Sequence, residues 1–261
     1  MNELRTIIVT GAYGAIGKAI ARQLAQKRAR VILVGRDKSK LISAVKEITQ
    51  VTGNENIGYE AVDLSRKSSI EAFARRWKGP LHLLINGAAT GPREWSETPE
   101  GIEVQWATNV LGYFWMITFF CDFMKEVNDA RIVNVASYWA GGLNFTDLEF
   151  RRRSYNNDTA YRQSKQADRM LTVAFSGRLK ASGITVNSCH PGDVSSKLSN
   201  SFGFGGHETP DEGAATPVWV ATDPDLKGIT GRYYEHMQET TCEFGRDHAA
   251  IEKLYDICLK Y

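Results

Sequence analysis

The sequence is poor in cysteine, and its four cysteines are not spaced as metal or disulfide motifs are. They lie far apart and form no CxxC pair: Cys121, Cys189, Cys242 and Cys258. Zinc sites and disulfide frameworks in small domains need closer, paired spacing. We therefore expect reduced thiols, a cytoplasmic location and no metal site.

Long hydrophobic runs are also absent. The most apolar stretch, residues 110–124, is interrupted by Thr118 and Asp122. It is shorter than the roughly 20 residues that a membrane-spanning helix requires. The first five residues lead directly into an apolar strand pattern, which leaves no room for a signal peptide. The expectation is a protein without a membrane span.

Neither a strong net charge nor a low-complexity linker occurs. Lys and Arg total 32 against 30 Asp and Glu, a net charge of +2. Nucleic-acid binding needs a clustered basic face, and the one sharp cluster, residues 151–153, is interpreted as a solvated loop. No repeat or Pro-rich linker divides the chain. A single domain over residues 1–261 without a nucleic-acid partner is predicted.

Strand-like and helix-like patterns alternate from the first residues. Continuous apolar runs, typical of strands covered on both faces, predict strands at residues 6–10 and 31–34. Further strands are expected at residues 57–62, 81–86, 131–137, 184–190 and 231–234. Helices are expected at residues 16–27, 41–51, 68–77, 98–127, 159–182 and 249–259. Alternation with right-handed crossovers predicts an α/β Rossmann fold. Its core would be a doubly wound parallel sheet of about seven strands, with helices on both faces.

A glycine-rich turn joins the first strand to the first helix. Glycines permit the tight turn and close approach of a pyrophosphate, and the helix N-terminus offers free N–H groups. A glycine cluster alone also marks ordinary turns, but this strand–turn–helix context favours a dinucleotide site. The turn residues expected to bind it are Gly11, Tyr13, Gly14, Ala15, Ile16 and Gly17.

The end of the second strand indicates which dinucleotide binds. NAD sites place an acidic residue there for the adenosine 2′-hydroxyl, whereas this chain has Gly35 followed by Arg36. A guanidinium can pair with a 2′-phosphate. The alternative is that Arg36 is a surface residue next to Asp37, which caps the following helix. We favour NADP(H) over NAD(H).

Tyr161 and Lys165 stand four residues apart in an expected helix, and so share one face. Such a pair alone is common, but it follows a cofactor motif here. Carbonyl reduction requires a proton donor, and a phenol near pKa 10 is a weak base in the reverse direction. A neighbouring ammonium favours the phenolate. Tyr161 is the expected acid/base and Lys165 its partner, which can also hold the nicotinamide ribose.

Ser137 and Asn109 complete the candidate catalytic set. Ser137 ends an expected strand at the carboxyl edge, where open α/β sheets bind ligands, and its hydroxyl can donate to a carbonyl oxygen. Asn109 lies inside a long expected helix, where asparagine is a mediocre helix former. Asn109 either stabilises a kinked backbone and an ordered water for proton relay, or is a buried amide whose hydrogen bonds are all made within the core.

Together, these motifs resemble the short-chain dehydrogenase/reductase family from residue 6 to about residue 234. The resemblance implies that Tyr161 is the acid/base, that Lys165 lowers its pKa and binds ribose, that Ser137 polarises the carbonyl and that Asn109 holds the relay water. It also implies further cofactor contacts: Asp63 and Leu64 beside the adenine, Asn86 and Ala88 in the cleft, Pro191 in the turn before Val194 at the carboxamide, and Ser196.

Details narrow the resemblance to the retinol dehydrogenase and WW-domain oxidoreductase branch. The interval between Ser137 and Tyr161 contains an extra loop, and residues 190–194 and 211–214 match that branch. Its members commonly carry a membrane anchor or an extra module in front of the domain. This chain begins at the first strand, and a retinoid substrate is therefore not carried over to it from the resemblance.

Residues 195–209, with Phe202 and Phe204, are interpreted as a flexible loop that covers an apolar substrate, or as a loop packed on the core. The leading hypothesis is an NADP(H)-dependent oxidoreductase that interconverts a small, apolar carbonyl and its alcohol. One rival is a catalytically silent NADP-binding scaffold or regulatory protein. A sugar-nucleotide epimerase or dehydratase is less compatible with the glycine spacing. A monomer and a homo-oligomer both remain open.

Overall fold

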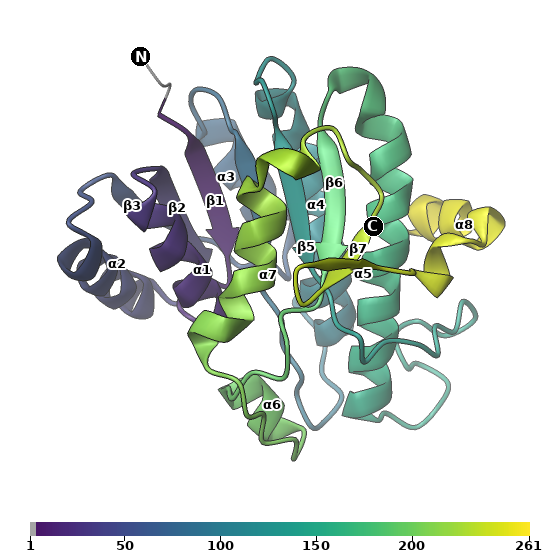
Figure 1. Cartoon of the computed structure of the whole chain (residues 1–261). Coiled ribbons are helices and arrows are strands. Elements are labelled where there is room, and N and C mark those ends of the chain that lie inside the picture. Colours follow the sequence, from purple (N-terminus) through teal and green to yellow (C-terminus); the bar gives the residue numbers. More distant parts are fainter. Residues whose placement is uncertain (1–3) are drawn as a thin grey trace.

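The computed structural model describes residues 4–261 as an α/β sandwich with one sheet. Residues 1–3 lie outside the described residues. They include the start of the predicted domain and part of the segment in which no signal peptide is expected. The strands are β1 (Thr6–Thr10), β2 (Arg30–Gly35), β3 (Ile57–Ala61), β4 (Leu83–Asn86), β5 (Arg131–Val135), β6 (Thr185–Cys189), β7 (Tyr233–Glu235) and β8 (Gln238–Thr240). Their order in the sheet is β3-β2-β1-β4-β5-β6-β7-β8 (Figure 1).

The first seven strands are parallel, as expected, and β8 adds an antiparallel edge. The expected count of about seven strands is thus one short. Sequence reasoning missed β8 because it is a three-residue, largely exposed strand without an apolar run. Its hairpin turn uses His236 and Met237 in the left-handed region instead of the usual glycine.

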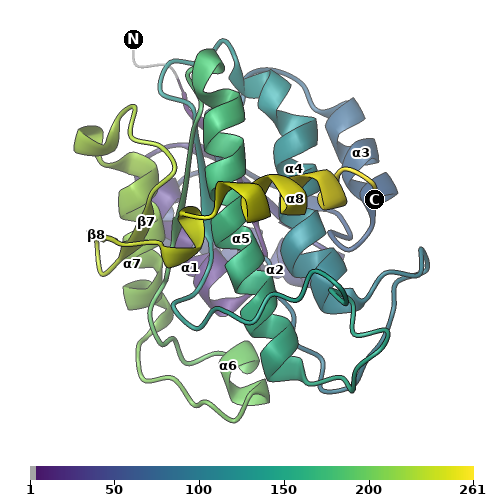
Figure 2. The ribbon, with the colours of Figure 1, turned by 90° about the vertical axis from the view of Figure 1, so that its right-hand side faces the viewer.

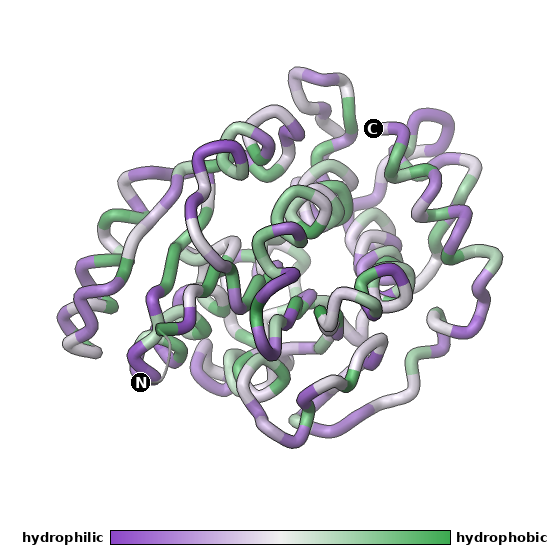
Figure 3. Tube along the Cα trace, turned by 90° about the horizontal axis from the view of Figure 1, so that it is seen from above, coloured by the Kyte–Doolittle hydropathy of each residue, from purple (hydrophilic) through white to green (hydrophobic). Residues whose placement is uncertain are grey.

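Helices cover both faces of the sheet. The main ones are α1 (Ala15–Gln26), α2 (Lys38–Thr52), α3 (Lys67–Arg76), α4 (Gly112–Phe120), α5 (Asn157–Leu179), α6 (Lys197–Ser201), α7 (Pro210–Thr222) and α8 (His248–Cys258). Shorter turns are η1 (Trp106–Leu111), η2 (Cys121–Met124), η3 (Lys180–Ser182), η4 (Pro224–Leu226) and η5 (Glu243–Gly245). Figure 3 shows hydrophilic residues mainly on the outer turns and hydrophobic residues on the packed elements.

Alternate residues of each central strand enter two separate cores. Ile8 and Ile32 pack with α3, α4 and α5, whereas Val9 and Leu33 pack with α1, α2 and α7. This period of two is what a strand buried on both faces requires. The continuous apolar runs in the sequence therefore correspond to a doubly wound sheet.

The expected helix over residues 98–127 begins too early. Residues 98–103 form a turn closed by an antiparallel bridge between Glu97 and Glu103. The buried carboxylate of Glu103 accepts hydrogen bonds from the backbone N–H groups of Gln105 (2.8 Å) and Trp106 (2.7 Å). These are N–H groups of a helix start, and the helix continues as η1, α4 and η2 to Met124.

The sequence interpretation also missed α6 and α7. Thr209 and Glu212 form a capping box with Pro210 in the first turn, which is a sequence-level helix start that was available. The short α6 lies inside the loop expected at residues 195–209 and begins at a Ser196 cap.

The C-terminal helix α8 covers the outer face of α5 (Figure 2). The Tyr255 ring packs against Phe114 of α4 at 5.2 Å and Phe175 of α5 at 5.3 Å between ring centroids.

The β1–α1 turn depends on two glycines that allow backbone to approach backbone. A Cβ at Gly17 would lie 2.4 Å from the Gly11 carbonyl oxygen, and one at Gly11 would lie 2.8 Å from the Ala88 Cα. Gly11 also has a φ of +67°. The start of α1 therefore packs on the turn, and the turn packs on the end of β4, only when both positions lack a side chain.

A pair of helical glycines tests this packing. We expect Gly17→Ala to lower the free energy of unfolding by about 1–3 kcal/mol because its methyl collides with backbone. The matched control is Gly177→Ala in α5, an exposed helical position with open space around it. It should raise stability by about 0.5–1 kcal/mol through helix propensity. Urea denaturation measures both, and equal effects would contradict the packing account.

Candidate active site

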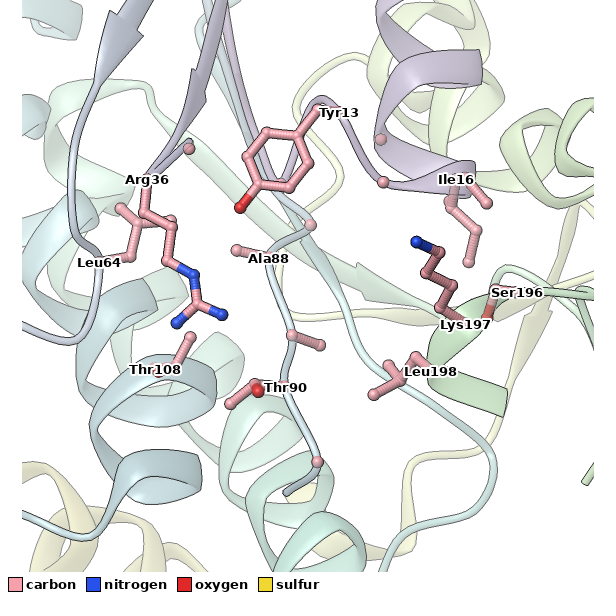
Figure 4. Close-up of a pocket in the computed structure, with 18 of the residues that line it drawn as sticks. Tyr13, Ile16, Arg36, Leu64, Ala88, Thr90, Thr108, Ser196, Lys197 and Leu198 are labelled. Carbon is pink, nitrogen blue, oxygen red and sulfur yellow. The ribbon is translucent and has the colours of Figure 1, made fainter. Parts of the chain in front are cut away.

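A cavity of about 650 Å³ lies at the carboxyl ends of the strands, above the β1–α1 turn. Figure 4 shows side chains around it from α1, η1, α6 and the loops that follow β1, β2, β3 and β4. Most residues expected at the cofactor line it: Gly11, Tyr13, Gly14, Ala15, Ile16, Gly17, Arg36, Asp63, Leu64, Ala88 and Ser196. Such a cavity beside a helix N-terminus fits a phosphate-linked dinucleotide.

One end of this cavity is basic. Arg36 extends its guanidinium into the cavity (Figure 4), and Lys40 of α2 also lines it. The Lys40 Nζ lies 5.6 Å from the Tyr13 ring centroid and 3.0 Å from Asp37 Oδ2. Asp37 caps α2, as one interpretation of the sequence proposed, by accepting from the Lys40 N–H. The cap and the cationic side chains therefore coexist.

The Tyr13 ring fills the space beside Gly35. A Cβ at Gly35 would lie 2.5 Å from Tyr13 Cε1. An acidic side chain at this position, as in NAD sites, has no room unless Tyr13 moves. Sequence reasoning missed Lys40 and also Lys197 of α6, whose amine points into the cavity (Figure 4). The spacing of four residues between Arg36 and Lys40 is the sequence feature that could have indicated a second cation at this end of the cavity.

A smaller cavity of about 80 Å³ adjoins the large one and contains the expected reactive groups. Ser137, Tyr161, Pro191 and Val194 line it. The two cavities share three lining residues: Ile16, Ser196 and Leu198. A ligand in the large cavity would thus end beside Tyr161.

The Tyr161 ring is half-buried and lies beside other aromatic rings. Phe202 lies 4.9 Å and Trp139 lies 6.0 Å from it between ring centroids. Burial raises the pKa of Tyr161; the Lys165 ammonium lowers it, the Asp168 carboxylate raises it and a hydrogen bond with Ser137 lowers it. The net shift is upward. The expected lowering by Lys165 operates, but burial and Asp168 outweigh it.

Lys165 lies beneath Tyr161 and lines neither cavity. Its Nζ donates to the Val135 carbonyl oxygen at 3.1 Å and to Asp168 Oδ2 at 2.9 Å. Burial acts to lower the pKa of Lys165, but the Asp168 carboxylate and the nearby phenols raise it above its usual value. The ammonium is therefore charged, and it is already paired.

Asn109 lies in η1, a π-helical turn, and its amide is fully engaged. Its Oδ1 accepts from the Thr90 N–H at 2.8 Å, and its Nδ2 donates to the Thr90 carbonyl at 3.0 Å and to Ser164 Oγ at 3.2 Å. Both earlier alternatives therefore apply in part: the backbone is irregular and the amide is satisfied. Asn109 thus links the loop after β4 to α5. Its partner in α5, Ser164, lies three residues after Tyr161.

Asn86 does not line either cavity. It is fully buried, and its Nδ2 donates to Asn134 Oδ1 of β5 at 2.9 Å. The residues that follow it, Gly87 to Pro92, line the large cavity instead. Sequence reasoning assigned Asn86 from the resemblance and missed Thr90, which holds Asn109.

Within residues 4–261, no group of three or more His, Cys, Asp or Glu side chains could hold a metal ion. No helix over the same residues is long and apolar enough to cross a membrane.

Similarity to known structures covers the whole fold. A protein from Mycobacterium paratuberculosis with no assigned role has a TM-score of 0.82 and 26% identity, with 98% of this chain and 93% of that chain covered. YwfH, an NADPH-dependent reductase of bacilysin biosynthesis, has a TM-score of 0.73 and 20% identity, covering 90% and 97%. At this identity YwfH shows a shared fold.

Sequence similarity is more specific. The short chain dehydrogenase family model matches residues 5–203. Mouse retinol dehydrogenase 11 is 35% identical over 97% of this chain and 84% of its own length. A Streptomyces antibioticus protein named "Probable oxidoreductase" is 36% identical over 93% of this chain and 88% of its own. The chain belongs to the short-chain dehydrogenase/reductase family, in its retinol dehydrogenase-like branch.

Proposed function

We propose that this protein is an NADP(H)-dependent oxidoreductase that interconverts an apolar aldehyde or ketone and its alcohol. The observation that carries the proposal is the continuity between two sites. A dinucleotide-sized cavity with a basic end meets a small cavity that holds Tyr161 and Ser137. Hydride transfer requires the cofactor's reactive end and a proton donor at adjoining positions.

The preference for NADP(H) rests on charge and space at the end of β2. Arg36 and Lys40 supply two cations for a 2′-phosphate, and a guanidinium can bind it through two parallel hydrogen bonds. Tyr13 occupies the space beside Gly35 that an acidic residue would need. Lys197 adds a third positive charge at the other side of the cavity.

The chemistry divides among four side chains. A bound nicotinamide cofactor supplies or accepts the hydride. Tyr161 donates its proton to the developing alkoxide, and Ser137 donates a hydrogen bond to the same oxygen. Lys165 provides positive charge beneath the phenol. Asn109 fixes the loop after β4 against α5.

The substrate class follows from the aromatic surroundings. Trp139, Phe202 and Phe204 gather over Tyr161, with Phe202 at 5.8 Å from Trp139. A cavity of about 80 Å³ is small beside the roughly 300 Å³ or more of ordinary ligand pockets. Residues 195–209 would therefore move aside to admit substrate and return over it. Apolar substrates would gain contact with these rings.

Cofactor discrimination is tested at Arg36. Arg36→Ala should weaken NADPH binding roughly tenfold or more while changing NADH binding little, because a charge-assisted hydrogen bond to the phosphate is lost. Cofactor fluorescence titration measures both affinities. Arg30→Ala, an exposed arginine at the opposite end of the same strand, is the matched control and should change neither. Equal losses for NADPH and NADH would contradict a 2′-phosphate contact.

Turnover is tested at Tyr161. Tyr161→Phe should lower the rate of benzaldehyde reduction about 100-fold or more, because the proton donor is removed. NADPH binding should persist, since Tyr161 lines the smaller cavity and not the large cofactor cavity. Steady-state absorbance of NADPH follows the reaction. Tight NADPH binding without turnover in the wild type, across aldehydes and ketones, would instead support the scaffold alternative.

The loop is tested at Phe202. Phe202→Ala should raise KM for benzaldehyde roughly tenfold through lost apolar contact and leave kcat nearly unchanged. Phe204→Ala should have a smaller effect, because that ring is 42% exposed. If both variants behave like the wild type, the loop does not cover substrate.

A further inference from the structure

A buried ion pair lies directly beneath the reactive phenol. Lys165 and Asp168 are three residues apart on α5, and their side chains are 1% and 0% exposed. The Lys165 Nζ lies 2.9 Å from Asp168 Oδ2 and 5.7 Å from the Tyr161 ring centroid. Asp168 Oδ1 has no hydrogen-bond partner in the described part of the chain. The carboxylate is therefore held by the reactive lysine itself.

The ionisable groups that face this pair from neighbouring elements are neutral. Tyr113 of α4 lies 5.1 Å from the Lys165 Nζ, and burial raises the pKa of its phenol. Burial likewise raises the pKa of the Cys189 thiol of β6 and of the Cys258 thiol of α8. Among the described residues, Asp168 is therefore the carboxylate that balances Lys165.

Burial makes the total charge of the cluster decisive. A buried group of charges is least costly when it is neutral overall. With Asp168 ionised and Lys165 protonated, the cluster is neutral while Tyr161 keeps its proton. Loss of that proton would leave one uncompensated negative charge. Burial raises the pKa of Asp168, whereas the Lys165 ammonium, 2.9 Å from Oδ2, favours the ionised carboxylate.

Without Asp168 the balance reverses. Lys165 and Tyr161 would then form a neutral pair only after one proton has been lost, and the loss would occur at lower pH. The unpaired Lys165 ammonium would then favour the Tyr161 phenolate, and the phenol would be the group that releases the proton. The carboxylate thus opposes the usual action of a lysine on a neighbouring phenol.

We propose that Asp168 is a positioning residue that neutralises the Lys165 ammonium and keeps the proton on Tyr161, which prepares this site for carbonyl reduction. The inference rests on the proposed function and adds to it the direction of the reaction that the site favours. Reduction consumes a proton from Tyr161, and the oxygen of the carbonyl receives it as the hydride adds to the carbon. Oxidation needs Tyr161 without its proton, and therefore begins at higher pH.

The test replaces the charge and keeps the shape. Asp168→Asn should lower the midpoint of Tyr161 ionisation by about one pH unit or more. Ultraviolet absorbance of the phenolate reports that ionisation, and each protein is compared with its own Tyr161→Phe partner to isolate this tyrosine. The midpoint for NADP⁺-dependent oxidation of benzyl alcohol should fall in parallel. NADPH-dependent reduction of benzaldehyde should lose activity from a correspondingly lower pH.

Matched variants separate charge from structure. Asp158→Asn removes a carboxylate from the first turn of the same helix and should leave both midpoints unchanged. Asp168→Glu keeps the charge and should retain the wild-type midpoint. If Asp168→Asn does not fold, Asp168→Ser removes the same charge and must show the same shift.

An unchanged or higher midpoint in folded Asp168→Asn would overturn the inference. Its failure is distinguishable from failure of the proposed function. If the wild type turns over no carbonyl, the proposed function fails, whereas the ultraviolet titration still reports whether Asp168 keeps the proton on Tyr161.

Discussion

The close approach of three backbone segments at the β1–α1 turn is the constraint on which the rest of the site depends. Gly17 packs on Gly11, and Gly11 packs on Ala88 at the end of β4. β1 and β4 are the neighbours between which the strand order reverses, and open α/β sheets bind ligands at this point. Two glycines therefore determine both the start of α1 and the floor of the large cavity.

A second constraint is electrostatic and lies at the opposite end of the site. Lys165 and Asp168 are buried on α5 beneath the half-buried Tyr161, and the protonation of each of the three groups depends on the others. Ile16, Ser196 and Leu198 join this region to the large cavity. Ser196 also caps α6 in the loop that carries Phe202. A cofactor bound in the large cavity would therefore share this wall with the loop.

The sequence was most informative where local spacing alone determines structure. The glycine turn and the Tyr161–Lys165 pair could be predicted because strand, turn and helix patterns are local. The helix start at Glu103 could not, because it depends on a side chain that folds back onto backbone N–H groups. Lys197 and Asp168 were missed for another reason: their importance arises from tertiary burial or from a cavity formed by distant segments. The cover that α8 provides over α5 is likewise a long-range contact.

Hydride transfer from NADPH to a carbonyl is the reaction proposed for this site. The most direct measurement is the reaction of benzaldehyde with NADPH that carries deuterium on the transferring face of the nicotinamide, followed by mass spectrometry of the product. The account predicts benzyl alcohol with one deuterium on the former carbonyl carbon. Bound NADPH without labelled product, for benzaldehyde and for a panel of ketones, would contradict it.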